Sequence, residues 1–395
     1  MSPEFTEQFE AHLRSKLIPF WSRLRDEEFG GYFGKVGFDL TCYKKATKNT
    51  VQTSRILYFF SESALMLDDE ECRKNADHAY TFLESHGIDS EYGGLFWSLT
   101  FSGEVEDPIK SSFAFAYGIL ALVSYYRLTK KEVALEHARN LYRLIELHFA
   151  DTIGYREVLS SDFQSNPYEI HRFSKGEYSG EKTMNTLLHL LEAYHSLYLV
   201  DPSEELLGRI RSIQTLFLTH IRRSDKKGLA MYFDSSMNQA SDYRSYGHEI
   251  EASWMVANSL CGLPSHEDDQ SILSLCDELA ADVYNEAFVA DSLMDEIHSP
   301  KVRRRRGHWI QAEAVMGFCH AYGRNTHLTH YRDAVQTIWD FIQKHLVDKR
   351  ENGEWFYVVD QDGTITEPHA VVWPWKGPYN NGRMCLTLMS NQYGI

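Results

Sequence analysis

The sequence predicts an all-α fold, a closed (α/α)6 barrel of six helical hairpins with short β-hairpins in its loops. An internal repeat is the first reason: Asp26–Phe33 recurs as Asp89–Phe96, with weaker echoes roughly every 60 to 75 residues, and a fixed period marks repeated supersecondary units. The second reason is that the helical segments between these copies alternate between nearly uniform apolar character and amphipathic character. A helix that is apolar on most sides is buried, whereas an amphipathic helix covers it from outside.

Each copy of the repeat starts with acidic residues and glycines, typical of a turn, and continues with aromatics, typical of a short strand. The segments between the copies predict about twelve helices of ordinary length. Two buried segments are each followed by an amphipathic one: Lys110–Arg127 by Glu132–His148, and Lys182–Val200 by Ser203–Thr219. The remaining predicted helices are Phe5–Leu17, Val51–Leu67, Glu71–Glu84, Glu249–Leu260 with Ser271–Tyr284, His308–Tyr322 with Tyr331–His345, and Asn381–Ser390.

Closure of the ring is favoured over the alternative, an open helical solenoid. An open array needs polar capping repeats at its ends, yet 381–388 has the apolar pattern of an inner helix. No linker rich in Pro, Gly or Ser divides the chain. We therefore expect residues 1–395 to form a single domain, with the functional site in the loops at one end of the repeats.

Composition excludes several classes of function. The chain has 40 Lys and Arg against 56 Asp and Glu, a net charge of −16, so the basic face of a nucleic-acid binder is not expected. The start lacks a signal-peptide pattern, no run of ~18 apolar residues occurs, and the six cysteines are scattered. We expect a cytoplasmic protein without membrane or nucleic-acid partners, a monomer or weak homodimer. The basic run Arg303–Arg306 is expected to be a solvated loop.

Two histidines are candidates for chemistry. His248 lies at a predicted helix start with Glu251 three residues later, on the same face, and a carboxylate there can orient the imidazole as a base requires. His189 lies on an inner helix with Asn185 one turn before it. The alternative for each is a histidine satisfied within the core. A metal site is disfavoured, because no third ligand with suitable spacing accompanies His248 and Glu251, and no cofactor is expected.

Aromatic residues flank polar ones near the starts of inner helices, notably Trp309, Trp375 and Tyr379. Aromatic faces can stack on the apolar faces of sugar rings, while polar neighbours bond the hydroxyls. Packing of large hydrophobic side chains in loops is the alternative, and composition does not decide between them.

Ordered motifs along nearly the whole chain resemble the N-acylglucosamine 2-epimerase superfamily, most closely its cellobiose 2-epimerase branch. They are Ile18-Pro19-Phe20-Trp21, Thr53-Ser54-Arg55-Ile56-Leu57, Lys182-Thr183-Met184-Asn185, Ser245-Tyr246-Gly247-His248-Glu249-Ile250-Glu251-Ala252, Gln311-Ala312-Glu313-Ala314 and Trp375-Lys376-Gly377-Pro378-Tyr379-Asn380-Asn381-Gly382-Arg383-Met384. The resemblance implies a six-hairpin barrel, in agreement with the repeat, and a carbohydrate substrate that is epimerised or isomerised without metal or nicotinamide.

The resemblance also implies roles for individual residues. A histidine takes the C2 proton of the open-chain aldose, and the cis-enediolate is reprotonated at C2 to give the epimer or at C1 to give the ketose. His248 would be the base, with Glu251 supporting it, and Arg55 would hold O1 and O2. The sugar-binding residues implied by the resemblance are Asn185, His189, Trp309 with its neighbour His308, and Trp375.

Three departures from the family pattern occur. Asn380 stands where the family motif has its second acid/base histidine, and Phe113 stands where Tyr is common. Thr53 stands where cellobiose 2-epimerases often have His, a mild change because other branches of the family also depart there. An amide exchanges no proton near neutrality, so three interpretations stay open: an engineered variant that traps sugar, a natural branch working with His248 alone, or a sugar-binding protein without catalysis. A single base favours isomerisation over epimerisation.

The function predicted is a carbohydrate 2-epimerase acting on glucose or mannose, free or at the reducing end of a β-1,4 disaccharide such as cellobiose. The alternatives are a mannose–fructose type isomerase and a catalytically impaired sugar-binding variant. A glycosidase on the same fold would need two opposed carboxylates, and Glu251 is the only strong candidate.

Overall fold

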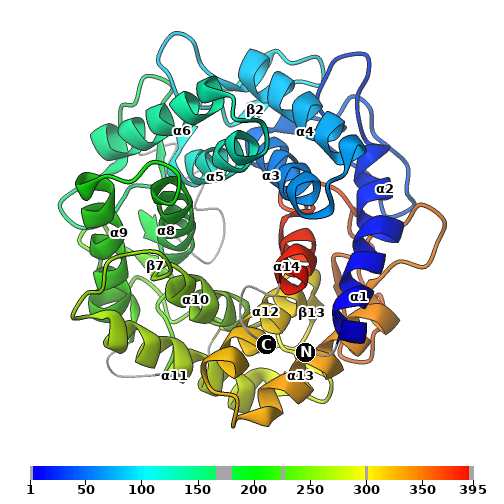
Figure 1. Ribbon diagram of the computed structural model, residues 1–395, viewed down its shortest axis with the longest axis vertical. Coiled ribbons are helices and arrows are strands. Elements are labelled where there is room, and N and C mark those ends of the chain that lie inside the picture. The colour runs from blue at the N-terminus through cyan, green and yellow to red at the C-terminus, as the bar shows by residue number, and fades with distance from the viewer. Residues whose placement is uncertain (1–2, 166–179, 224–226, 299–300, 391–395) are drawn as a thin grey trace.

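The computed structural model describes residues 3–165, 180–223, 227–298 and 301–390 and confirms the predicted barrel. Six helices form an inner ring around a central axis (Figure 1): α3 (Thr50–Leu67), α5 (Ser112–Thr129), α8 (Met184–Tyr198), α10 (Tyr246–Asn258), α12 (His308–Arg324) and α14 (Tyr379–Met389). The outer ring contains α1 (Pro3–His12), which runs through η1 (Leu13–Leu17) into α2 (Ile18–Ser22), α4 (Glu70–Phe82), α6 (Glu132–Leu144), α9 (Glu204–Leu216), α11 (Asp269–Ala287) and α13 (Thr329–Phe341). The ring closes because α14 packs against both α12 and α3.

Most outer helices end in a π-helical turn. These turns are η2 (Leu83–Gly87), η3 (Ile145–Phe149), η4 (Phe217–Ile221) and η5 (Ile342–Leu346), and the predicted ends of the outer helices fall inside them. The chain then reverses through the glycine-containing loops of the repeat, where Gly30, Gly31, Gly93 and Gly94 have positive φ. A side chain at Gly31 or Gly94 would also collide with Phe82 or Phe115, which explains the paired glycines of the repeated motif.

Short antiparallel ladders join neighbouring repeats where the inner helices begin. They pair β1 (Lys48–Asn49) with β2 (Ser98–Leu99), β4 (Lys110–Ser111) with β5 (Val158–Leu159), β6 (Lys182–Thr183) with β7 (Tyr232–Phe233), β8 (Arg244–Ser245) with β11 (Glu296–His298), and β13 (Arg306–Gly307) with β14 (Val358–Val359). Further pairings add β3 (Val105–Asp107) to β2, β12 (Lys301–Arg303) to β11, and β9 (Phe288–Val289) to β10 (Ser292–Leu293). The N-terminal ends of the inner helices therefore lie together at one end of the barrel.

A buried cation precedes every inner helix, at Lys48, Lys110, Lys182, Arg244, Arg306 and Lys376. Lys48 Nζ lies 2.7 Å from an Asp26 oxygen, and Lys110 Nζ lies 2.6 Å from Asp89, because a buried charge needs a partner. Arg306 is fully buried, and its Nε donates to Ser292 Oγ over 2.7 Å. The expectation of a solvated loop for Arg303–Arg306 is thus wrong for Arg306, which is the fifth of these repeated cations.

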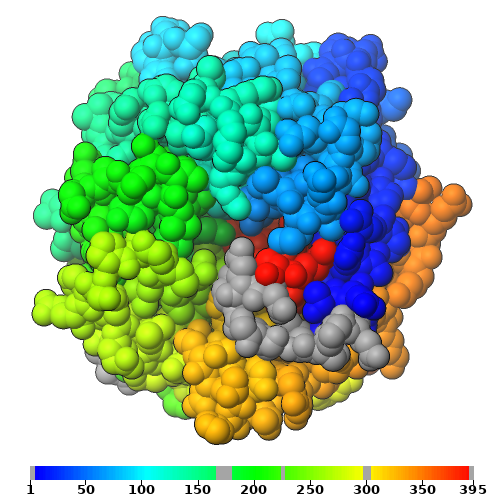
Figure 2. Space-filling view, in the orientation of Figure 1, coloured from blue at the N-terminus to red at the C-terminus, as the bar shows by residue number. Residues whose placement is uncertain are grey.

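The opposite end of the barrel faces the viewer in Figure 2, where part of α14 is visible at the bottom of a central hollow. A cavity of about 330 Å³ lies at this end, lined by Met66, Ser124, Leu199, Asn258 and Ser390 from the C-terminal parts of the inner helices and the residues that follow them. Glu192 and Arg383 reach it from the centre of the barrel. No helix in the described ranges is both long and apolar enough to cross a membrane.

Candidate active site

A ring of polar side chains crosses the barrel axis, one from each inner helix. Each member stands seven residues after one of the repeated cations: Arg55, Tyr117, His189, Glu251, Glu313 and Arg383, all at most 7% exposed. In α3, α5, α8, α10 and α12 this is the sixth helical residue, so at a rise of 1.5 Å per residue it lies about 7.5 Å beyond the helix start. The six positions therefore meet at one depth.

Arg383 forms salt bridges with the carboxylates on one side of this ring. Its Nη1 donates to Glu192 Oε1 over 2.7 Å, and its Nη2 donates to Glu313 Oε1 over 2.7 Å and to Glu251 Oε1 over 3.1 Å. Burial opposes ionisation of Glu192, but Arg383 and His189 outweigh it and hold the pKa of Glu192 at about 2. Burial, together with the charge of Glu313, raises the pKa of Glu251 above its usual value.

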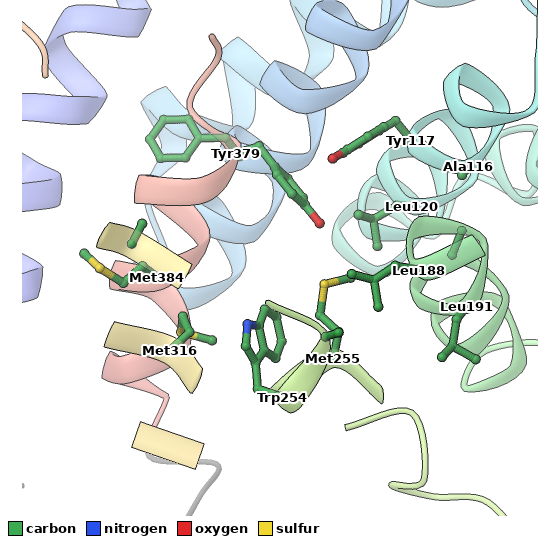
Figure 3. Packing of buried hydrophobic residues seen from close by; sticks show 14 of the residues in the cluster. Ala116, Tyr117, Leu120, Leu188, Leu191, Trp254, Met255, Met316, Tyr379 and Met384 are labelled. Atoms are coloured by element: carbon green, nitrogen blue, oxygen red, sulfur yellow. The ribbon is translucent and has the colours of Figure 1, made fainter. Parts of the chain in front are cut away.

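The other side of the ring is a chain of hydrogen bonds from Arg55 to Glu192. Arg55 Nη2 donates to the hydroxyl of Tyr117 over 2.8 Å, and this hydroxyl lies 3.0 Å from His189 Nε2. His189 Nδ1 lies 3.3 Å from Glu192 Oε2. Figure 3 shows the hydroxyls of Tyr117 and Tyr379 pointing into the space between the inner helices.

His248 lies nearer the mouth of the barrel, in the first turn of α10. Its Nδ1 lies 2.7 Å from Oγ of Ser245, which also caps the helix, and the Trp309 ring lies 4.7 Å from the imidazole. Burial lowers the pKa of His248 to about 3, with a smaller effect from His189, so the imidazole is neutral at neutral pH. The expected partner was wrong: Glu251 bonds Arg383 and not His248, because the guanidinium satisfies a buried carboxylate better, and Ser245 orients the imidazole instead.

Asn380 occupies the same place in its repeat as His248, four residues after the repeated cation. Its Nδ2 donates to Glu313 Oε1 over 2.8 Å. His308 is buried with Nδ1 3.1 Å from the carbonyl oxygen of Tyr357, and burial lowers its pKa well below the usual value. It therefore supports a loop, whereas its neighbour Trp309 faces His248.

Aromatic side chains line the same end of the barrel. Trp375 is 45% exposed and contacts Trp97 and Phe113, with ring centroids 5.9 Å and 6.0 Å away. The ring of Phe113 packs edge-on against His189 at 5.4 Å. Asn185 is half-buried at the start of α8, one turn before His189. Trp309, Trp375, Phe113 and Asn185 thus lie at the mouth, as a sugar site requires.

Sequence reasoning missed four members of this site, namely Tyr117, Glu192, Glu313 and Arg383. Three of them could have been found, because Tyr117, Glu313 and Arg383 share the spacing of seven residues from a repeated Lys or Arg. Glu192 lacks this spacing but follows His189 by three residues, the i, i+3 spacing of the contact that the two side chains make. Only its bond to Arg383 on α14 depends on the closed barrel. In the described part of the chain, no three His, Cys, Asp or Glu side chains come together as metal ligands.

The model of the N-acylglucosamine 2-epimerase (GlcNAc 2-epimerase) family matches residues 31–377. The chain belongs to this family. The cellobiose 2-epimerase of Dictyoglomus turgidum is 38% identical over 384 residues, 97% of each chain. The solved cellobiose 2-epimerase from Bacillus thermoamylovorans B4167 covers 99% of this chain and 100% of its own, with TM-score 0.94 and 34% identity. A D-mannose isomerase of Marinomonas mediterranea is 22% identical over 378 residues, 89% of each chain.

Proposed function

We propose that the chain is a carbohydrate 2-epimerase that interconverts glucose and mannose, free or at the reducing end of a β-1,4 disaccharide. The observation that carries this proposal is His248, a neutral imidazole whose Nδ1 is held by Ser245 at the end of the barrel where Arg55 and the aromatic side chains also lie. Membership in the family, with cellobiose 2-epimerases at up to 38% identity over 97% of the chain, supports the same chemistry.

The reaction follows from these groups. With Nδ1–H of His248 donating to Ser245 Oγ over 2.7 Å, Nε2 is unprotonated and takes the C2 proton of the open-chain aldose. The C2–H electron pair then forms the C1–C2 double bond, and the carbonyl pair moves to O1 to give a cis-enediolate. Arg55 stabilises the negative oxygen. Because Asn380 supplies no acid proton, the epimer forms when the enediolate rotates in the site and the imidazolium of His248 returns the proton to the other face of C2.

A second candidate, an aldose–ketose isomerase of the mannose–fructose type, is favoured by one observation. Asn380 takes the position of the family's second histidine and is bonded to Glu313, yet an amide carries no exchangeable acid proton near neutrality. A single imidazole easily moves a proton between C2 and C1 on one face, which yields the ketose.

The test is incubation with cellobiose, mannobiose, glucose and mannose in deuterated buffer, followed by NMR. The epimerase predicts deuterium at C2 together with the C2 epimer as the first product, and the isomerase predicts ketose first. Saturable sugar binding without deuterium at C1 or C2 would refute both and leave a binding protein. Release of monosaccharide would indicate a glycosidase, which is disfavoured because Glu251 and Glu313 are both bonded to Arg383.

A further inference from the structure

The hydrogen bonds around His189 fix the position of every proton in the array. Because Arg383 keeps Glu192 ionised, this carboxylate is an acceptor only. His189 Nδ1, 3.3 Å from Glu192 Oε2, therefore carries a proton. Burial lowers the pKa of His189, so the imidazole is neutral and Nε2 is the acceptor. The hydroxyl 3.0 Å from Nε2 is then a donor, so Tyr117 gives its proton to His189.

The same hydroxyl has one remaining role, which is to accept from Arg55. Arg55 Nη2 lies 2.8 Å from the Tyr117 oxygen, and the guanidinium also lies over the Tyr117 ring, 4.3 Å from its centroid. Arg55 also donates from Nη1 to the carbonyl oxygen of Trp375, over a longer distance of 3.4 Å. Arg55 Nε has no hydrogen-bond partner in the described part of the chain. Tyr117 is thus the main contact that sets the orientation of Arg55.

We propose that Tyr117 is a positioning residue that holds the guanidinium of Arg55 for the two reacting oxygens of the sugar, and that His189 and Glu192 act through Tyr117. This inference rests on the proposed function and changes one part of it. His189 was expected to bind the sugar, but both of its ring nitrogens are already engaged. Tyr117 also lies one turn beyond Phe113, with ring centroids 5.1 Å apart.

Two unreactive probes separate orientation of Arg55 from general sugar binding. Gluconohydroxamate has a planar pair of adjacent oxygens, as the enediolate does, whereas glucitol has hydroxyls without that pair. In titrations of the full chain, the wild type should prefer the hydroxamate. Tyr117→Phe should weaken hydroxamate binding about tenfold or more, the usual loss for a hydrogen bond to a charged group, and change glucitol binding less than about twofold.

The matched control is Tyr194→Phe. Tyr194 is a buried tyrosine on α8 whose hydroxyl donates to Glu146 over 2.6 Å, outside the ring, so this variant should keep the wild-type preference for the hydroxamate. Unfolding midpoints of all variants show that each one folds. Equal losses of hydroxamate affinity in Tyr117→Phe and Tyr194→Phe would overturn the proposal, and so would an unchanged affinity in Tyr117→Phe.

Variants of His189 test whether it acts through Tyr117. His189→Leu should weaken hydroxamate binding as much as Tyr117→Phe does. The double variant should bind the hydroxamate no more weakly than either single variant, since the effects of residues that act as a unit are not additive. His189→Gln, whose amide oxygen can still accept from Tyr117, should retain more affinity than His189→Leu. Additive losses, or a loss of glucitol binding in His189→Leu, would instead make His189 a direct sugar ligand and overturn the proposal.

Turnover distinguishes this inference from the function on which it rests. If the wild type exchanges deuterium, Tyr117→Phe should lower kcat more than it raises KM, because Arg55 is needed most when the enediolate forms. A wild type that prefers the hydroxamate and loses this preference in Tyr117→Phe, yet exchanges no deuterium, would refute the epimerase and retain the positioning of Arg55. A wild type without that preference would overturn the positioning role itself.

Discussion

Replacement of Asn380 by histidine tests the missing second acid/base directly. Asn380 Nδ2 and the Nδ1 of a histidine are both attached to Cγ, so an imidazole at position 380 can donate to Glu313 Oε1 as the amide does over 2.8 Å. A histidine oriented in this way by a carboxylate presents its Nε2 to the centre of the site, the arrangement of an acid/base with an orienting partner. His248 and the new histidine would occupy equivalent positions of their two repeats.

The size of the effect follows from the chemistry that the imidazole adds. A positioned general acid or base contributes about 10² to 10⁴ in rate, so Asn380→His should raise the rate of epimer formation by about that factor. Formation of ketose needs only the proton shuttle on one face, and we expect it to change much less. The ratio of epimer to ketose should therefore rise in parallel with the rate.

The assay is NMR in deuterated buffer, with cellobiose and glucose as substrates and both products measured in one spectrum. Asn380→Gln is the matched control, because it enlarges the side chain and keeps an amide that cannot exchange a proton. An unchanged rate and product ratio in a correctly folded Asn380→His variant would refute the reasoning. A similar gain in Asn380→Gln would also do so, since it would show that size and not proton transfer matters.

Four more predictions address the base, the scaffold and the mouth of the site. Because burial lowers the pKa of His248 to about 3, we expect kcat/KM to stay level as pH falls from about 7 to about 5, and an acid limb centred near the usual histidine pKa would contradict a buried neutral base. The same shift means that the unfolded chain binds the proton more readily, so the stability contributed by neutral His248 should fall below about pH 6.5, as urea unfolding at several pH values can measure. Lys110→Met should lower the free energy of unfolding by about 3 kcal/mol, since it leaves the buried carboxylate of Asp89 without its cation, and an unchanged urea midpoint would contradict that role. Trp375→Ala should raise KM for cellobiose roughly 3- to 10-fold, the value of one aromatic contact, and leave KM for glucose nearly unchanged, whereas equal effects on both sugars would place Trp375 at the reacting ring.

The helices could be predicted from sequence because each inner helix is apolar on most sides and each outer helix on one. Lys110–Arg127 reads as buried in the sequence, and α5 (Ser112–Thr129) is buried over nearly all of its length. Helix ends were harder to place: α10 begins at Tyr246 and not at Glu249, because its capping serine, Ser245, lies before a stretch without a clear apolar period. The role of Arg306 was missed for a related reason, since a run of arginines gives no sign of which one points inward.

Site residues could be proposed from the sequence where a local motif contains them. Their partners could not be predicted where the contact joins two different helices. His248, Arg55 and Trp309 were predicted as site residues; His248 contacts Trp309, and Arg55 donates to the carbonyl oxygen of Trp375. The spacing of three residues also predicted that Glu251 supports His248, yet its carboxylate bonds Arg383, which is 132 residues away in the chain. No local pattern shows that such a partner will arrive, and the same holds for the 191 residues between Glu192 and Arg383.

The repeated cation explains how six similar helices can carry six different functional side chains at one depth. The buried partners of these cations come from loops or helices of the same repeat or a neighbouring one, as Asp26 binds Lys48 and Glu249 binds Arg244, and these bonds fix where the following helix begins. Because an α-helix turns about 100° per residue, one residue inserted between the cation and the ring position would rotate that side chain away from the axis. The spacing of seven residues is therefore constant in all six repeats, while the identity of the seventh residue is free to change. Arginine, tyrosine, histidine and glutamate thus occupy equivalent positions, and the chemistry of the site is decided by which of them meet.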